Sequence, residues 1–251
     1  MNIVVAVKQV PDVQQIRIRN REPVMEGVPY AIGKIDKNAL ELGIQLKEAA
    51  EHQLLVLSAG NEEVEETLKE ALAIGADEAY LVLDDAIDNM ESAQIATILA
   101  AAVKKIDDVG LLIFGEGSSD NYSGQVSSRV AELLGLPQVG YASQITLEGQ
   151  TAKITRQLED GEEVLAVQLP VVVSVLGDIN EPRIPAVTQI LKAGRKPKEI
   201  LELDDLDLEL AGDKLVKTIS TLAPDTNRKN ITVKDVSELA AALRTEGFIG
   251  R

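Results

Sequence analysis

The sequence predicts an α/β protein built on a doubly wound, mostly parallel sheet, with an antiparallel ribbon and a C-terminal arm. Residues 3–7, 54–57 and 79–83 are short continuous apolar runs, which are typical of parallel strands buried on both faces. A segment with helical spacing of apolar residues follows each run, and this alternation favours a parallel sheet covered by helices. Residues 138–168 alternate between apolar and polar, which predicts antiparallel pairing.

The first strands and helices alternate along residues 1–105. After the strand at residues 3–7, residues 8–34 carry three prolines and a hairpin pattern around residues 16–18, a long excursion of the kind that is often functional. A helix follows, with Asp36 as its N-cap or a first-turn residue. The strand at residues 54–57 ends at Ser58-Ala59-Gly60, and Asn61 is the expected cap of the next helix. The strand at residues 79–83 precedes a helix from 91 to 105.

A glycine loop at residues 115–125 is the strongest functional signal. It follows an apolar strand at residues 111–114 and runs through small polar residues into a helix over 126–134. Such loops bind ligands in open α/β sheets, because glycine permits close backbone approach and the helix start offers unpaired N–H groups. Glu116 and Asp120 would repel a bare phosphate but suit ribose hydroxyls or adenine amines. The alternative is a purely steric turn with serine caps, since neither a Walker lysine motif nor GxGxxG is present.

The pattern changes after Pro137. Residues 138–168 predict a ribbon with a turn at Asp160-Gly161, and residues 170–175 return a buried strand. Residues 180–197 are irregular, basic and rich in proline, which in so acidic a chain indicates a contact surface for an acidic partner, or else a solvated connector. Residues 199–251 are weakly patterned, with one helix over 236–246, and resemble an arm without a core of its own.

The composition narrows the function classes. With 25 basic and 41 acidic residues, the net charge of −16 argues against nucleic acid or an anionic membrane as partner. No cysteine is present, and the one histidine, His52, lies in a connector, so a cysteine nucleophile or a Ser-His-Asp triad is not expected. No apolar segment reaches the ~20 residues of a membrane span and no leader is visible, so we expect a cytoplasmic protein.

Several blocks of this chain resemble the small (beta) subunit of the electron-transfer flavoprotein family. They are the opening VVAVKQVPD, the segment from Asp36 to Glu41, LSAG after the second strand, ALAIGADEA, the ribbon signature from Ile154 to Ser174, and DINEPRIPAVTQILKAGRKP. The blocks occur in the family's order and cover roughly residues 1–200, while the last fifty residues match loosely.

The resemblance implies one half of a heterodimer. In this family the large subunit holds a redox flavin adenine dinucleotide (FAD), and the beta subunit buries an adenine nucleotide in a fold of the adenine-nucleotide alpha-hydrolase kind. Residues 1–200 would form that domain, with a recognition loop at about 178–197, and residues 201–251 an arm contacting the large subunit. The implied cofactor-binding residues are Ala6, Asp36, Ala59, Gly115, Asp120, Asn121, Tyr122, Ser123, Gly124, Gln125, Val126 and Ser127.

The identity of that nucleotide depends on the end of the loop. The monophosphate-binding type carries Asn-Gln-Thr-Gly where this chain has Gly124-Gln125-Val126-Ser127, so valine replaces the threonine. Electron-bifurcating members carry Asp-Gly-Asp-Thr-Ala-Gln-Val-Gly-Pro; Asp120, Gln125 and Val126 match, while serines replace the Gly-Pro. The pattern looks closest to members linked with nitrogen fixation and carnitine metabolism. We therefore expect FAD, with AMP as the alternative and NADH as a further ligand of the complex.

The resemblance also implies docking of redox partners through the recognition loop. Val187 matches the family's apolar anchor, with Arg183, Lys192 and Arg195 around it. The partners would be acyl-CoA or other dehydrogenases, or a quinone- or ferredoxin-linked protein, and the chain would be an electron carrier rather than a catalyst on its own. The rival hypotheses are a stand-alone ATP- or AMP-binding hydrolase or stress-type sensor on the same fold, and a scaffold with an empty pocket.

Overall fold

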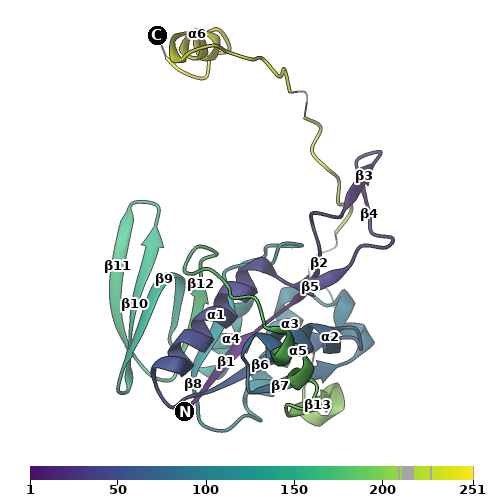
Figure 1. The fold of residues 1–251 in the computed structure, drawn as a ribbon, viewed down its shortest axis with the longest axis vertical. Helices are drawn as coiled ribbons and strands as arrows, with labels where there is room; N and C mark the ends of the chain where they lie inside the picture. The colour runs from purple at the N-terminus through teal and green to yellow at the C-terminus, as the bar shows by residue number, and fades with distance from the viewer. Residues whose placement is uncertain (209, 211–217, 227, 251) are drawn as a thin grey trace. The chain divides into compact units, whose positions relative to one another are not determined.

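A nine-stranded sheet runs through the protein in the order β11-β10-β9-β12-β8-β1-β6-β7-β13 (Figure 1). The computed structural model describes residues 1–208, 210, 218–226 and 228–250. Six neighbouring strands are parallel: β12 (Val171–Val175), β8 (Val109–Gly115), β1 (Asn2–Ala6), β6 (Gln53–Gly60), β7 (Glu78–Leu83) and β13 (Lys198–Glu202). The expected doubly wound, mostly parallel sheet is therefore confirmed.

The antiparallel ribbon continues this sheet at one edge. It consists of β9 (Gln138–Glu148), β10 (Thr151–Leu158) and β11 (Gly161–Gln168). The first of these strands pairs in parallel with β12 and antiparallel with β10, so it joins the two parts of the sheet. The turn after β10 lies at Glu159-Asp160, one residue before the predicted Asp160-Gly161, because Gly161 already begins β11.

Helices cover both faces of the parallel part, which explains the continuous apolar runs. In β1, Ile3 and Val5 belong to one core cluster and Val4 and Ala6 to another. The first cluster contains residues of α1 (Lys34–Ala49), α2 (Val64–Ile74) and α5 (Val187–Ala193). The second contains residues of α3 (Ser92–Val103) and α4 (Val126–Leu134). Successive strand side chains point to opposite faces, so a strand buried on both must be apolar throughout.

Some element boundaries differ from the sequence prediction. The segment at residues 180–197 is not irregular throughout, since it contains α5, a helix of 7 residues that is too short for a clear periodic pattern. The cap of α2 is Glu63, and the side chain of Asn61, two residues earlier, accepts the Glu63 N–H at 2.9 Å. A 3₁₀ helix, η1 (Asp85–Asn89), precedes α3. The last strand, β13, crosses residue 200, and it is followed by η2 (Leu203–Leu206) with Leu206 buried.

The chain divides into two units by internal contacts: residues 1–16 with 25–217, and residues 17–24 with 218–251. The first also contains a small pair of strands, β2 (Gln9–Pro11) and β5 (Tyr30–Ile32). The second contains the hairpin β3 (Arg17–Arg19) and β4 (Glu22–Val24), and α6 (Val236–Thr245). Arg21 exchanges main-chain and side-chain hydrogen bonds with Ala223. None of the residues of α6, all of which the structure describes, is buried.

Candidate functional site

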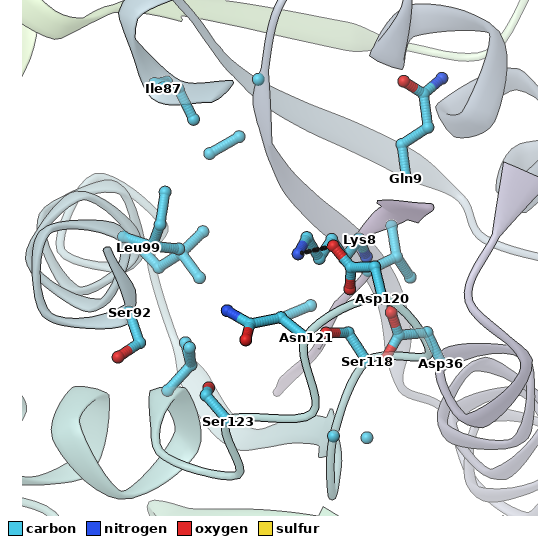
Figure 2. Close-up of a pocket in the computed structure, with 18 of the residues that line it drawn as sticks. Lys8, Gln9, Asp36, Ile87, Ser92, Leu99, Ser118, Asp120, Asn121 and Ser123 are labelled. Atoms are coloured by element: carbon cyan, nitrogen blue, oxygen red, sulfur yellow. Dashed lines mark hydrogen bonds and ion pairs between the residues drawn. The ribbon is translucent and has the colours of Figure 1, made fainter. Parts of the chain in front are cut away.

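A cavity of about 560 Å³ opens at the carboxyl ends of the central parallel strands (Figure 2). The chain leaves β1 toward β6 and β7 on one side and later returns to place β8 on the other. At such a reversal of strand order the connections diverge and leave a crevice, which is where ligands bind in open α/β sheets. Its volume lies within the ≈ 300–1,000 Å³ typical of small-molecule sites.

The cavity brings together the predicted cofactor-binding residues except Tyr122. They come from the ends of three strands, the first turn of α1, the glycine loop and the start of α4. The lining ones are Ala6, Asp36, Ala59, Gly115, Asp120, Asn121, Ser123, Gly124, Gln125, Val126 and Ser127. The Gln125 side chain is already engaged within the protein, because its Oε1 accepts from Ser92 at 3.3 Å and from Arg129 at 2.9 Å. Binding roles for these residues remain predictions.

Tyr122 lies outside the cavity. Its backbone is left-handed, with φ of 48°, and its side chain is 56% exposed. The ring packs over Gly117, where an added Cβ would lie 3.0 Å from the ring atoms. The hydrogen bond to Glu116 raises the pKa of the phenol. A left-handed tyrosine cannot be recognised from sequence, so the side-chain direction was not predictable.

Two glycines set the course of the loop. At Gly115 an added Cβ would lie 2.6 Å from Asp36 Oδ1, so only glycine lets this strand end approach the carboxyl group. Gly124 has φ of +63°, a conformation that other residues rarely adopt. Both glycines are therefore required for steric reasons. They let the chain follow a course that brings the loop and the start of α4 to the cavity. The N–H groups of the first helical turn have no partner within the helix.

Asp36 is a buried acid at the floor of the site. It lies in the first turn of α1, whose N-cap is Gly33, so it is a first-turn residue and not the cap. The side chain is 7% exposed, and its Oδ2 accepts the main-chain N–H of Lys8 at 2.8 Å. Burial raises the pKa of this carboxyl to about 7, against the hydrogen bonds from Lys8 and Gly115. Asp36 can therefore exchange a proton near neutral pH.

Replacing Asp36 by asparagine should change how stability depends on pH. The folded pKa of about 7 lies above the ordinary 3.8, so the fold favours the protonated carboxyl. The wild-type free energy of unfolding should fall, relative to Asp36→Asn, as pH rises from 3.8 through 7, by up to roughly 4 kcal/mol, and then level off. Chemical unfolding of nucleotide-free protein at several pH values measures this difference. Two curves that stay parallel across this range would show that Asp36 is not a buried, proton-binding carboxyl.

Lys8 is a lining residue that the sequence analysis missed. Its Nζ donates to Asp120 Oδ2 at 2.5 Å, which joins the segment after β1 to the glycine loop (Figure 2). Burial favours the neutral form of Asp120, but hydrogen bonds from Lys8 and Ser118 outweigh this and lower its pKa. Among the described residues that line the cavity, Lys8 alone has a basic side chain, beside the carboxylates of Asp36, Glu63, Asp88, Glu116 and Asp120. A phosphate group would be held by Lys8 and the α4 N–H groups, and hydroxyls by the carboxylates.

The opposite wall was also missed, because it comes from segments that carry no glycine motif. It combines polar side chains from β2, from the residue after β6 and from the first residue of α3 with an apolar patch from η1, α3 and β8. The polar ones are Gln9, Asn61 and Ser92, and the apolar ones are Ile87, Ile95, Leu99 and Phe114. A flat apolar ring with hydrogen-bonding edges fits such a wall.

The predicted docking residues lie on or beside α5, away from the cavity. Val187 is 72% exposed at the first position of this helix, and Lys192 and Arg195 are exposed as well. Further exposed apolar side chains not singled out from the sequence are Ile184, Ile190 and Leu191. Arg183 differs from the expected rim residue, because its guanidinium is paired with Glu41 and Glu48 of α1.

Within the described part of the chain, no helix combines the length and apolar character that a membrane crossing requires. Nor does the described part contain three or more acidic, histidine or cysteine side chains grouped so that they could hold a metal ion.

Comparison with known proteins gives a consistent result. The model of the family described as electron transfer flavoprotein domain matches residues 24–206. The electron transfer flavoprotein subunit beta of Thermoanaerobacterium thermosaccharolyticum is 37% identical over 236 residues, which cover 91% of this chain and 90% of that protein. That of Bacillus subtilis is 33% identical over 257 aligned positions, covering 99% and 100%.

A third relative belongs to a larger complex. The caffeyl-CoA reductase-Etf complex subunit CarD of Acetobacterium woodii is 37% identical over 211 residues, which cover 83% of this chain and 80% of that protein. The family match spans most of the chain, and the aligned regions cover 80% to 100% of these relatives. The chain therefore belongs to the electron transfer flavoprotein family, as a beta subunit, as its sequence motifs predicted.

Proposed function

We propose that this chain is the nucleotide-holding half of a heterodimeric electron carrier, which docks partner dehydrogenases and passes electrons to or from a flavin. The observation that carries the proposal is the cavity at the switch point, lined by the glycine loop, Asp36 and Lys8. The family supplies the electron-transfer function, and the cavity supplies a place for an adenine nucleotide.

The residues around the cavity fit FAD, which is the ligand we propose. FAD would supply a ring system that accepts and releases electrons, as well as a pyrophosphate and hydroxyls that need polar partners. Lys8 and the start of α4 would hold phosphate, the carboxylates would accept from hydroxyls, and the wall around Leu99 and Phe114 would contact a ring. Val126 at the first turn of α4 offers no hydroxyl for a monophosphate, which disfavours AMP.

Partner contact is assigned to two surfaces. Residues 178–197 would dock the redox partner, with the apolar side chains of α5 at the centre and Lys192 and Arg195 at the rim. Such an arrangement separates a desolvated anchor, which holds the complex, from charges that set encounter rate and salt dependence. Residues 201–251 would contact the large subunit, since α6 and the following residues expose Val236, Leu239, Phe248 and Ile249.

Copurification tests the proposal against its rival. The proposed carrier should be recovered as a yellow complex with a second, large-subunit chain, and should accept electrons from a dehydrogenase. If the complex also reduces a low-potential acceptor only while NADH reduces a second one, it performs electron bifurcation. A colourless homodimer that consumes ATP would instead identify a nucleotide hydrolase or sensor on this fold.

A further inference from the structure

We propose that Arg183 is a positioning residue, which holds residues 180–186 on α1 so that α5 presents its apolar face, and that it makes no contact with the partner. This inference rests on the proposed docking function. It reassigns a residue that sequence alone places in the basic rim of the docking surface.

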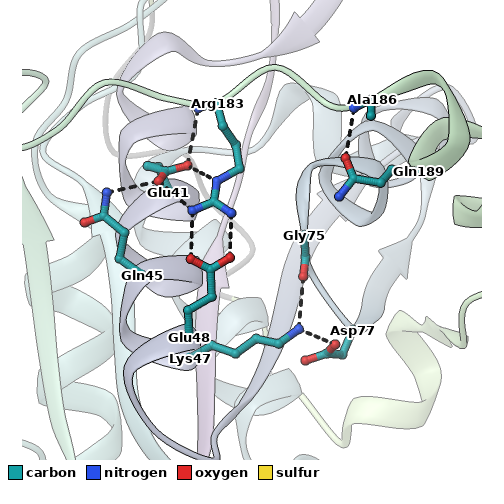
Figure 3. Close-up of polar contacts among 9 residues, drawn as sticks. All are labelled: Glu41, Gln45, Lys47, Glu48, Gly75, Asp77, Arg183, Ala186 and Gln189. Carbon is teal, nitrogen blue, oxygen red and sulfur yellow. Dashed lines mark hydrogen bonds and ion pairs between the residues drawn. The ribbon is translucent and has the colours of Figure 1, made fainter.

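The guanidinium of Arg183 is engaged on two acids of α1 (Figure 3). Its Nε and Nη2 donate to the two oxygens of Glu41 at 2.8 and 3.0 Å. Its Nη1 and Nη2 donate to the two oxygens of Glu48 at 2.6 and 3.1 Å. Both pairs are bidentate, which fixes orientation as well as distance. These hydrogen bonds, Glu48 first, raise the pKa of Arg183 further.

Glu41 makes this arrangement costly to break. It is 4% exposed, and the Arg183 main-chain N–H also points at its Oε2, at 3.3 Å. Turning Arg183 toward a partner would leave a buried carboxylate without its cation, which is strongly destabilising. The cluster of one guanidinium and two carboxylates also has a net negative formal charge. It therefore adds no positive charge to the rim, which leaves Lys192 and Arg195 as the basic residues there.

The stretch from Asn180 to Lys196, which contains α5, is held to the rest of the protein at both ends. Next to Arg183, the Asn38 side chain donates to the Asn180 carbonyl at 2.7 Å, and the Asn180 side chain donates to the Asn38 carbonyl at 3.0 Å. Beyond α5, Lys196 Nζ donates to the carbonyls of Leu72 and Ala76, at 2.7 and 2.5 Å. Between these ties Ala193 is buried, while Val187 is exposed. A helix of 7 residues is marginal alone, so these ties fix its orientation.

Substitutions of the arginine and its partners distinguish positioning from contact. In the assembled complex, Arg183→Gln and Glu48→Gln should each raise the concentration of partner dehydrogenase needed for half-maximal electron transfer, by about fivefold for Arg183→Gln. The rate at saturation should stay unchanged. The double variant should lose no more than Arg183→Gln alone, because both changes remove one interaction. Arg183→Lys should show the same loss as Arg183→Gln, because an ammonium group keeps the charge but cannot make the two bidentate hydrogen bonds of the guanidinium.

A second readout tests the anchoring without a partner. Hydrogen exchange of residues 180–193 should accelerate in Arg183→Gln and in Glu48→Gln. The control is Glu163→Gln, which removes an ion pair with Arg156 at 2.6 Å between β10 and β11, outside residues 180–193, and should change neither exchange in that segment nor docking.

Failure of the positioning role can be distinguished from failure of the docking function. Three outcomes would each overturn the positioning role. They are unchanged hydrogen exchange in Arg183→Gln, wild-type docking in Arg183→Lys, and a changed salt dependence of docking in Arg183→Gln while Glu48→Gln has no effect. They would leave the docking function standing. If Val187→Asp also leaves docking unchanged, the docking function itself fails, and this inference fails with it.

Discussion

Replacing Ser127 by leucine should empty the cavity of nucleotide while leaving the fold intact. Ser127 is the second residue of α4, it is buried, and it lines the cavity beside the N–H groups of the first turn. A leucine side chain there would occupy the space of the ligand and screen those N–H groups. FAD released by denaturing the purified complex should fall from two to about one per heterodimer, because the flavin of the large subunit is not affected.

The neighbouring serine provides a matched control. Ser128 is exposed and does not line the cavity, so Ser128→Leu makes the same change one residue further along α4 and should keep full nucleotide content. Both variants should retain the circular dichroism spectrum of the wild type. Full nucleotide content in Ser127→Leu would show that the ligand lies elsewhere.

Replacing Val187 by aspartate should weaken docking of the partner dehydrogenase at least tenfold. The side chain is 72% exposed in this chain and is assigned to an apolar contact, where a carboxylate would have to lose its water without gaining a partner. A tenfold change corresponds to about 1.4 kcal/mol. Val187→Ala removes two methyl groups and should cost about 1 kcal/mol. Electron-transfer rates measured at a series of dehydrogenase concentrations give both values.

A second exposed valine controls for the added charge. Val164 of β11 is 60% exposed and lies outside residues 178–197, so Val164→Asp adds the same charge without touching the assigned docking surface. It should leave docking unchanged. Equal losses in the two variants would trace the effect to net charge and remove Val187 from the interface.

The fold was predictable because its signals are local and repeated. In β1, Val4 and Val5 lie on opposite faces and are both buried, so the run had to be apolar throughout, and the same holds for β8. The strand ends follow from these runs. The sequence therefore predicts that Ala6, Ala59 and Gly115 lie together at the carboxyl ends of the parallel strands, and the cavity lies there.

The remaining features depend on contacts between distant residues. Lys8 lines the cavity because its main chain is held by Asp36 and its side chain pairs with Asp120, 112 positions along the chain. The sequence could not show that Arg183 is paired, because its ion-pair partners, Glu41 and Glu48, lie on a helix far from it in sequence. Helix α5 was missed since 7 residues give too few turns for a periodic pattern.

We propose that this chain holds an adenine nucleotide, FAD, in the cavity at the switch point. The most direct test of this proposal is to denature the purified heterodimer, count flavin by absorbance, and identify every released nucleotide by mass spectrometry. We expect two FAD per heterodimer, of which Ser127→Leu removes one. One FAD with one AMP would contradict the choice of FAD, and one FAD with no second adenine nucleotide would contradict the site itself.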